Sequence, residues 1–147
     1  MKTFFDHSAQ EELRQRVDKL TAQSASQWGR MASAQMLAHC TVAFQVPVGD
    51  LQVAKHPLRF IGSIFKKSLL GEKPFSKNSP TAKEFLVRQD CDFESEKTKF
   101  LTAFQKVAQG PSSVTCFNHP FFGKMTTDDW GRLLYKHLDH HLQQFGV

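Results

Sequence analysis

The chain has 147 residues, of which 40% are hydrophobic and 12% aromatic, and this suits a single domain, residues 1–147, with a buried core. No run approaches the roughly 18 to 20 consecutive apolar residues of a membrane span, and Met1 to Asp6 lacks the apolar run of a signal peptide, so we expect a cytoplasmic protein without a membrane partner. The formal net charge of +5 could serve a phosphate-binding surface, but most basic residues are dispersed among acidic ones.

The N-terminal third of the chain predicts two helices. Ser8 and Glu11 have the spacing of a capping box, which places the first helix over residues 8–24. Ser33 is the expected N-cap of the second helix, which should end near Pro47 because proline inside a helix removes a hydrogen bond. We expect the second helix to be buried because apolar residues lie on two of its sides. One side carries Met36, His39, Cys40 and Ala43, and the other carries Leu37, Phe44 and Val48.

A shorter helix is predicted over residues 57–71, as an insertion or a lid between the second and third helices of a bundle. Pro57 suits the first helical position, and Gly71 ends the segment. Its expected apolar face consists of Leu58, Ile61, Ile64, Phe65 and Leu69. The lysines in and after it, Lys66, Lys67, Lys73 and Lys77, are expected to form a solvated face. No nucleic-acid reader motif accompanies them, so we do not expect a nucleic-acid partner.

Two further long helices are predicted in the C-terminal half. Residues 73–80 should form a loop and residues 84–88 an extended segment. Asp92 is the expected N-cap of a helix that runs to residue 108, with apolar residues at helical spacing. The last helix should begin at Thr126 or Thr127 and end at Phe145. The fold class is therefore all-α, with four long helices and one short helix.

The last helix carries a histidine pair on its apolar face. His137 and His141 lie one turn apart among the residues expected to face the core, which are Trp130, Leu133, Leu134, Gln144 and Phe145. Burying an unpartnered polar group costs on the order of 1 to 3 kcal/mol, so both imidazoles need partners. A shared metal ion would satisfy both. A thermolysin-like site is not indicated, because no glutamate follows the first histidine.

His39 is the expected third ligand, because it is the only other histidine on a predicted core face. Three protein nitrogens leave coordination positions free for water or substrate, as in catalytic metal sites. The nitrogen donors suit zinc, nickel, cobalt, manganese or iron(II), and affinity order does not choose among these divalent ions. The sequence thus predicts a metal site of His39, His137 and His141.

Other histidines and the cysteines near the predicted metal site could have either a structural or a functional role. Core histidines are more often hydrogen-bonded packing residues than ligands, and Cys40 is more simply a small buried hydrophobe than an extra ligand or a redox-sensitive thiol. His119 lies just before the last helix and could approach the mouth of the site. Candidate residues that would lie around the metal ligands without binding the metal themselves are His140, Gln35, Asn118 and Tyr135. The three cysteines form no CxxC pair, so disulfides are not expected.

Three segments together resemble a bacterial family of proteins of unknown function within the DinB/YfiT-like superfamily. They are WGRMASAQMLAHC (residues 28–40), PFSKNSPT (residues 74–81) and HPFFGKMTTDDWGRLLYKHLDHHLQQFG (residues 119–146). The resemblance covers nearly the whole chain. It implies an up-down-down-up four-helix bundle with the extra short helix between bundle helices two and three, and a frequent homodimer. It also implies a metal bound by one histidine of the second helix and a HxxxH pair of the last, which here are His39, His137 and His141.

The leading functional hypothesis is a metal-dependent enzyme that acts on a small-molecule substrate. Better-studied members of that superfamily are thiol-dependent transferases or isomerases, and others are described as hydrolases, so the resemblance implies a divalent metal ion and a low-molecular-weight thiol as cofactors. The alternative is a non-enzymatic module, binding a small ligand or related to stress, in which the histidines form a polar network without bound metal. Chelator sensitivity separates the two hypotheses.

Overall fold

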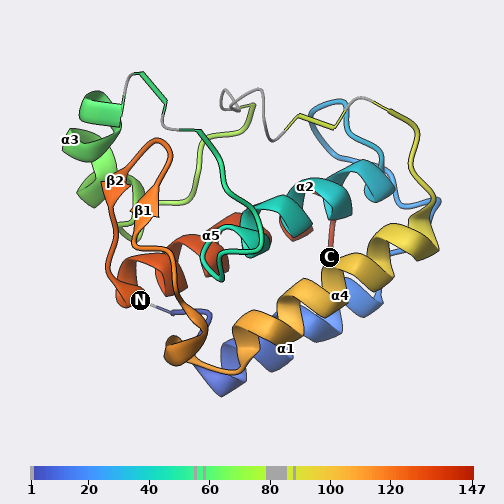
Figure 1. The fold of residues 1–147 in the computed structure, drawn as a ribbon. Coiled ribbons are helices and arrows are strands. Elements are labelled where there is room, and N and C mark those ends of the chain that lie inside the picture. The colour runs from blue at the N-terminus through green and yellow to red at the C-terminus, as the bar shows by residue number, and fades with distance from the viewer. Residues whose placement is uncertain (1, 55, 58, 79–85, 88) are drawn as a thin grey trace.

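The computed structural model describes residues 2–54, 56–57, 59–78, 86–87 and 89–147, and these residues are mostly helical (Figure 1). The helices are α1 (His7–Asp18), α2 (Ser33–Gln45), α3 (Arg59–Leu69), α4 (Phe93–Ala108) and α5 (Thr127–Gln144). A 3₁₀ turn, η2 (Pro111–Ser113), precedes an antiparallel hairpin of β1 (Asn118–His119) and β2 (Gly123–Lys124). The all-α class is confirmed. Within the described ranges, no helix combines the length and the apolar character needed to cross a membrane.

The first helix differs from its prediction at both ends. Asp6, and not Ser8, stands at the N-cap, where its backbone oxygen accepts from the amides of the third and fourth residues after it. Its carboxylate accepts from Thr3 N at 3.1 Å, which fixes the chain before the helix. The predicted end at residue 24 was wrong because Thr21 and Ser24 bond to each other in a turn, with Thr21 N donating to Ser24 Oγ at 3.0 Å. Leu20 is buried although it lies outside the helix.

The starts of α2, α4 and α5 are set by local capping. The Gln35 side chain accepts from Ala32 N at 3.0 Å, so Ser33 is the first helical residue and not the N-cap. Asp92 Oδ1 accepts from Ser95 N at 2.8 Å. Thr126 Oγ1 accepts from Asp129 N at 3.1 Å. The predicted bounds of α4 and α5 are confirmed, because these caps are encoded within four residues of each helix start.

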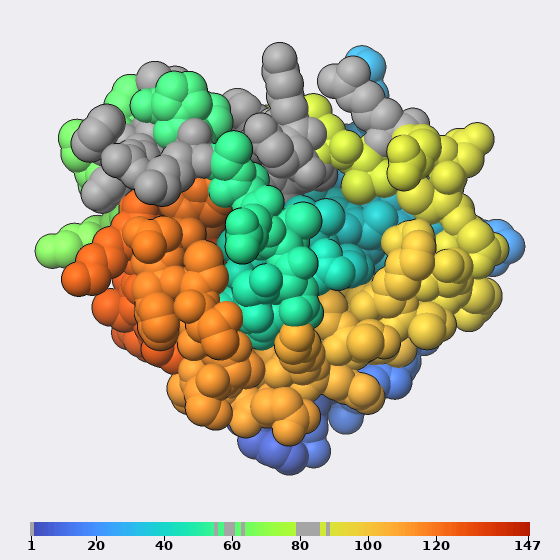
Figure 2. Space-filling view, in the orientation of Figure 1, coloured from blue at the N-terminus to red at the C-terminus, as the bar shows by residue number. Residues whose placement is uncertain are grey.

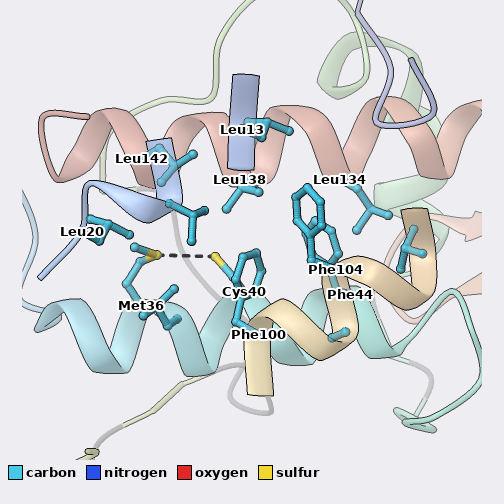
Figure 3. Packing of buried hydrophobic residues seen from close by; sticks show 14 of the residues in the cluster. Leu13, Leu20, Met36, Cys40, Phe44, Phe100, Phe104, Leu134, Leu138 and Leu142 are labelled. Carbon is cyan, nitrogen blue, oxygen red and sulfur yellow. Dashed lines mark hydrogen bonds between the residues drawn. The ribbon is translucent and has the colours of Figure 1, made fainter. Parts of the chain in front are cut away.

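The four long helices share one hydrophobic core, part of which is seen in Figure 3. It includes Leu13 and Val17 of α1, Met36, Leu37, Cys40 and Phe44 of α2, Phe100 and Phe104 of α4, and Leu134, Leu138 and Leu142 of α5. Helices α2 and α4 pack closely, and Figure 2 shows their atoms against one another across one face of the molecule. This core holds α2 and α5 side by side, which brings their inward faces together.

Helix α3 and the hairpin lie together at one end of the molecule (Figure 1). The predicted apolar face of α3 is largely exposed, since Ile61, Ile64 and Phe65 are 47%, 77% and 55% exposed. Lys66 does not extend freely into solvent, because its Nζ donates to Asp129 Oδ2 at 2.9 Å and to Lys124 O at 2.8 Å. The lysine cluster is thus only partly the solvated face that was predicted. Leu58 and most of the predicted extended segment 84–88 lie outside the described residues.

We predict that Gly62→Ala destabilises the protein by about 1 to 3 kcal/mol through overpacking. A Cβ at this position would lie 2.2 Å from Phe121 O and 2.7 Å from a ring carbon of Phe121, so α3 would have to move off the hairpin. Urea unfolding measures the change, and Ser68→Ala at an exposed position of the same helix is the control. Equal stability of the glycine variant and the wild type would contradict this packing.

Candidate metal centre

His39 of α2 and the pair His137 and His141 of α5 come together between the two helices. The four-residue spacing places both α5 imidazoles on the face that meets α2. One ligand atom from each of the three residues lies within 4.8 Å of the others. His39 and His141 are only 4% and 8% exposed. The three histidines selected from the sequence therefore form one cluster, which could hold a metal ion.

The spacing of the ring nitrogens is close to that of a coordination site. Nε2 of His39 and Nε2 of His137 are 2.9 Å apart, and the ring centroids of the three pairs are 4.7 to 4.8 Å apart. Two nitrogens bound to zinc at 2.0–2.1 Å with tetrahedral angles would be roughly 3.3 Å apart, so small side-chain rotations suffice. His137 Nδ1 is buried, and no group in the described part of the chain hydrogen-bonds it. The three imidazole donors and the spacing of their ring nitrogens fit a bound metal.

Gln144 orients the ring of His141, a role that the sequence interpretation missed. The Gln144 side-chain nitrogen donates to Trp28 O at 2.7 Å, which turns the amide oxygen toward His141 Nδ1 at 2.8 Å. An amide oxygen only accepts, so His141 Nδ1 carries the proton and Nε2 keeps its lone pair. In metal-binding histidines, a hydrogen bond from the second ring nitrogen to a residue that does not itself bind the metal fixes the tautomer. The signal was available, because Gln144 follows His141 by three residues on the same helical face.

Burial keeps the two histidines of α5 in their neutral form. It lowers the pKa of His137 well below 6.5, and the nearby His141 and His39 lower it further. Burial and His39 lower the pKa of His141 to about 3, although the hydrogen bond that His141 donates to Gln144 acts in the opposite direction. A histidine must be neutral to bind a metal, so these rings have the required form at neutral pH without first losing a proton.

The three histidines line a pocket of about 800 Å³ between the bundle helices, α3 and the hairpin. Its walls are largely apolar and aromatic, and include Trp28, Phe75, Phe121, Phe122, Trp130 and Leu133. Pockets of about 300 to 1,000 Å³ with such walls and a few polar groups are typical of small-molecule sites. The candidate metal centre thus lies where a ligand of moderate size can reach it.

Lys136, next to the histidine pair, closes one wall of the pocket. Its Nζ donates to three backbone carbonyls at the end of α3, those of Leu69, Gly71 (2.8 Å) and Lys73 (2.7 Å). Burial lowers its pKa, and the aromatic ring of Phe75 lies 4.6 Å from the ammonium group. Carbonyls at a helix C-terminus attract cations, so Lys136 attaches α3 to α5.

The other residues considered from the sequence divide into two groups. His140 and His119 line the pocket, and the ring of His140 lies 5.3 Å from that of His141. Gln35, Asn118 and Tyr135 do not line it: Gln35 caps α2, and the Tyr135 hydroxyl donates to Glu12 at 3.4 Å. The side chains of Gln35 and Tyr135 therefore have hydrogen-bond partners away from the three histidines.

Cys40 follows His39 directly, but its side chain belongs to the hydrophobic core. The thiol is fully buried and donates to Met36 Sδ at 3.6 Å, as the dashed line in Figure 3 shows. Burial raises its pKa strongly, so the thiolate form that binds metals is disfavoured. The interpretation of Cys40 as a small buried hydrophobe is confirmed, and the alternative of an extra metal ligand is wrong.

Comparison with known families places the whole chain in one of them. A family model described as "Protein of unknown function (DUF1569)" matches residues 2–146, so the chain belongs to this family. No curated protein and no solved structure matches the chain. The family description assigns no activity.

Proposed function

We propose that the protein binds one divalent metal ion through His39, His137 and His141 and uses it to act on a small molecule in the adjoining pocket. The observation that carries the proposal is the convergence of three imidazoles from two helices, with ligand atoms within 4.8 Å of one another. The reaction class is that of a transferase, an isomerase or a hydrolase. A divalent ion held by three nitrogens would supply Lewis-acid chemistry there, lowering the pKa of a water or thiol that reaches it.

The chain's own groups prepare this site in three ways. Gln144 holds the His141 ring with its Nε2 lone pair free for a ligand bond. The core around Cys40 and Leu138 fixes the backbone of α2 and α5 on either side of the cluster. His39 and His141 are almost fully buried, and electrostatic interactions are stronger at buried groups than in bulk water.

A low-molecular-weight thiol as co-substrate is also part of the proposal. The resemblance to the DinB/YfiT-like superfamily implies it, and the pocket of about 800 Å³ has room for a thiol beside a second small molecule. We further propose the up-down-down-up DinB-like topology and the homodimer that the same resemblance implies. The shared core of the four long helices supports the bundle, and sedimentation equilibrium tests the dimer.

A titration of the metal-free chain with zinc tests metal binding. We expect one zinc ion per chain and a melting temperature that rises with zinc and falls again on adding a chelator. Elemental analysis of protein purified without a histidine tag or added metal then identifies the ion acquired in the cell. No binding of zinc, nickel or manganese would contradict the proposal.

A second candidate function has one specific observation in its favour. The 2.9 Å separation of His39 Nε2 and His137 Nε2 is also that of a direct hydrogen bond, in which one ring donates to the other. The histidines would then form a polar core network in a non-enzymatic ligand-binding or stress-related module. This alternative requires a melting temperature that does not respond to zinc or to chelators.

We predict that Gln144→Leu lowers metal affinity 10- to 100-fold, because the outer hydrogen bond that fixes the His141 ring is lost. Gln144→Glu is the matched control, since a carboxylate still accepts from His141 Nδ1 but cannot donate to Trp28 O, so it should lose less affinity than the leucine variant. Competition with a chromogenic chelator measures both. Equal affinity of the leucine variant and the wild type would show that Gln144 has no part in the site.

A further inference from the structure

His119 is a pocket histidine that the proposed metal centre does not use. It lies at the end of β1, and its ring packs between Phe122 and Trp130 at centroid distances of 4.4 and 5.3 Å. The indole nitrogen of Trp130 is itself held by a bond to Cys116 O at 2.7 Å. The ring of His119 therefore has a fixed position in the pocket wall.

The hairpin turn determines which nitrogen of His119 carries the proton. Nδ1 accepts from the backbone amides of Phe121 and Phe122, both at 3.1 Å. An amide N–H only donates, so Nδ1 must present its lone pair, and in the neutral ring the proton is on Nε2. Burial lowers the pKa of His119 to about 4, so this neutral tautomer persists across the physiological pH range. His119 is a fixed neutral hydrogen-bond donor.

The pocket has the electrostatic character to receive an electron-rich group. Its charged lining residues, among those the structure describes, are the cations Arg30, Lys73 and Lys136, and no carboxylate is among them. His119 is also close enough to His137 to influence its pKa. His119 and the three-histidine cluster thus line the same pocket.

We propose that His119 donates a hydrogen bond from Nε2 to a carbonyl or carboxylate oxygen of the small molecule that the pocket binds. The ligand class is an organic molecule with an apolar body, which contacts the aromatic walls, and one such oxygen. A neutral imidazole can polarise a carbonyl without transferring a proton, so the same contact would orient and activate an electrophilic substrate. This inference goes beyond metal binding, since it concerns a different residue and a ligand group.

Benzoate is a suitable probe because it combines an apolar ring with a carboxylate. We expect benzoate to bind the full chain as purified, and His119→Asn to weaken that binding about tenfold or more. The asparagine oxygen can still accept from the two hairpin amides, as Asx turns do, but the donor at the Nε2 position is lost. His119→Gln, whose amide nitrogen reaches about as far as Nε2, should recover part of the affinity.

Two readouts separate this role from a structural one. Long-range ¹H–¹⁵N spectra of the wild type should show His119 as the Nε2–H tautomer between pH 5 and 8, with its resonances shifted by benzoate. His7→Asn, the same substitution at an exposed position of α1, is the control and should bind like the wild type. A protonated or Nδ1–H ring, no benzoate binding by the wild type, or equal binding by His119→Asn would each overturn the proposal. Metal content of every variant is measured in parallel, so loss of the metal centre is recognised independently.

Discussion

Replacing His137 by alanine should lower the affinity for zinc on the order of 100-fold or more while leaving the helical content unchanged. The ring of His137 lies close to both other members of the cluster, with Nε2 at 2.9 Å from that of His39 and its ring centroid 4.7 Å from that of His141. The two remaining imidazoles would supply only two ligand nitrogens to the metal. Because loss of an outer hydrogen bond alone costs 10- to 100-fold, loss of a ligand should cost at least as much.

The change is measured by chelator competition, with circular dichroism to verify the fold. His39→Ala should behave in the same way, and His7→Ala is the control because this histidine is exposed on α1. Near wild-type zinc affinity in both cluster variants would show that the ion binds elsewhere.

Phe44→Ala should destabilise the protein by about 3 to 5 kcal/mol, the largest effect expected on folding. The ring of Phe44 is fully buried and contacts Phe4, Phe100 and Phe104, with centroid distances of 5.0 to 6.0 Å. Truncation removes these edge and stacking contacts and leaves a cavity where α2 meets α4. Urea unfolding of the variant measures the loss.

Phe117→Ala provides the matched control, because Phe117 is 47% exposed. Its truncation should change the free energy of unfolding by less than about 1 kcal/mol. A Phe44 variant no less stable than the Phe117 variant would contradict the described core.

The bounds of α4 and α5 and the three-histidine cluster could be predicted because their signals are local. Asp92 and Thr126 cap the helices that follow them, and the four-residue spacing of His137 and His141 fixes a shared face whatever the rest of the chain does. His39 was selected because its neighbours on α2 are apolar. The error at α1 had a local cause as well, since the turn of Thr21 and Ser24 competes with the helix for the same backbone groups.

The features that the sequence interpretation missed depend on contacts between distant segments. Gln144 orients His141 only because Trp28 O, 116 residues away, receives its amide nitrogen. The hairpin that fixes the His119 tautomer has strands of two residues each, too short for an alternating pattern to indicate them. Lys136 is buried, and backbone carbonyls at and after the end of α3 accept hydrogen bonds from its ammonium group.

X-ray absorption at the zinc edge of the zinc-loaded chain tests the central claim most directly. Three imidazole nitrogens at about 2.0–2.1 Å, falling to two in His39→Ala, are the expected result. Sulfur at about 2.3 Å, an all-oxygen shell, or a spectrum that is unchanged in His39→Ala would contradict a metal centre built from His39, His137 and His141.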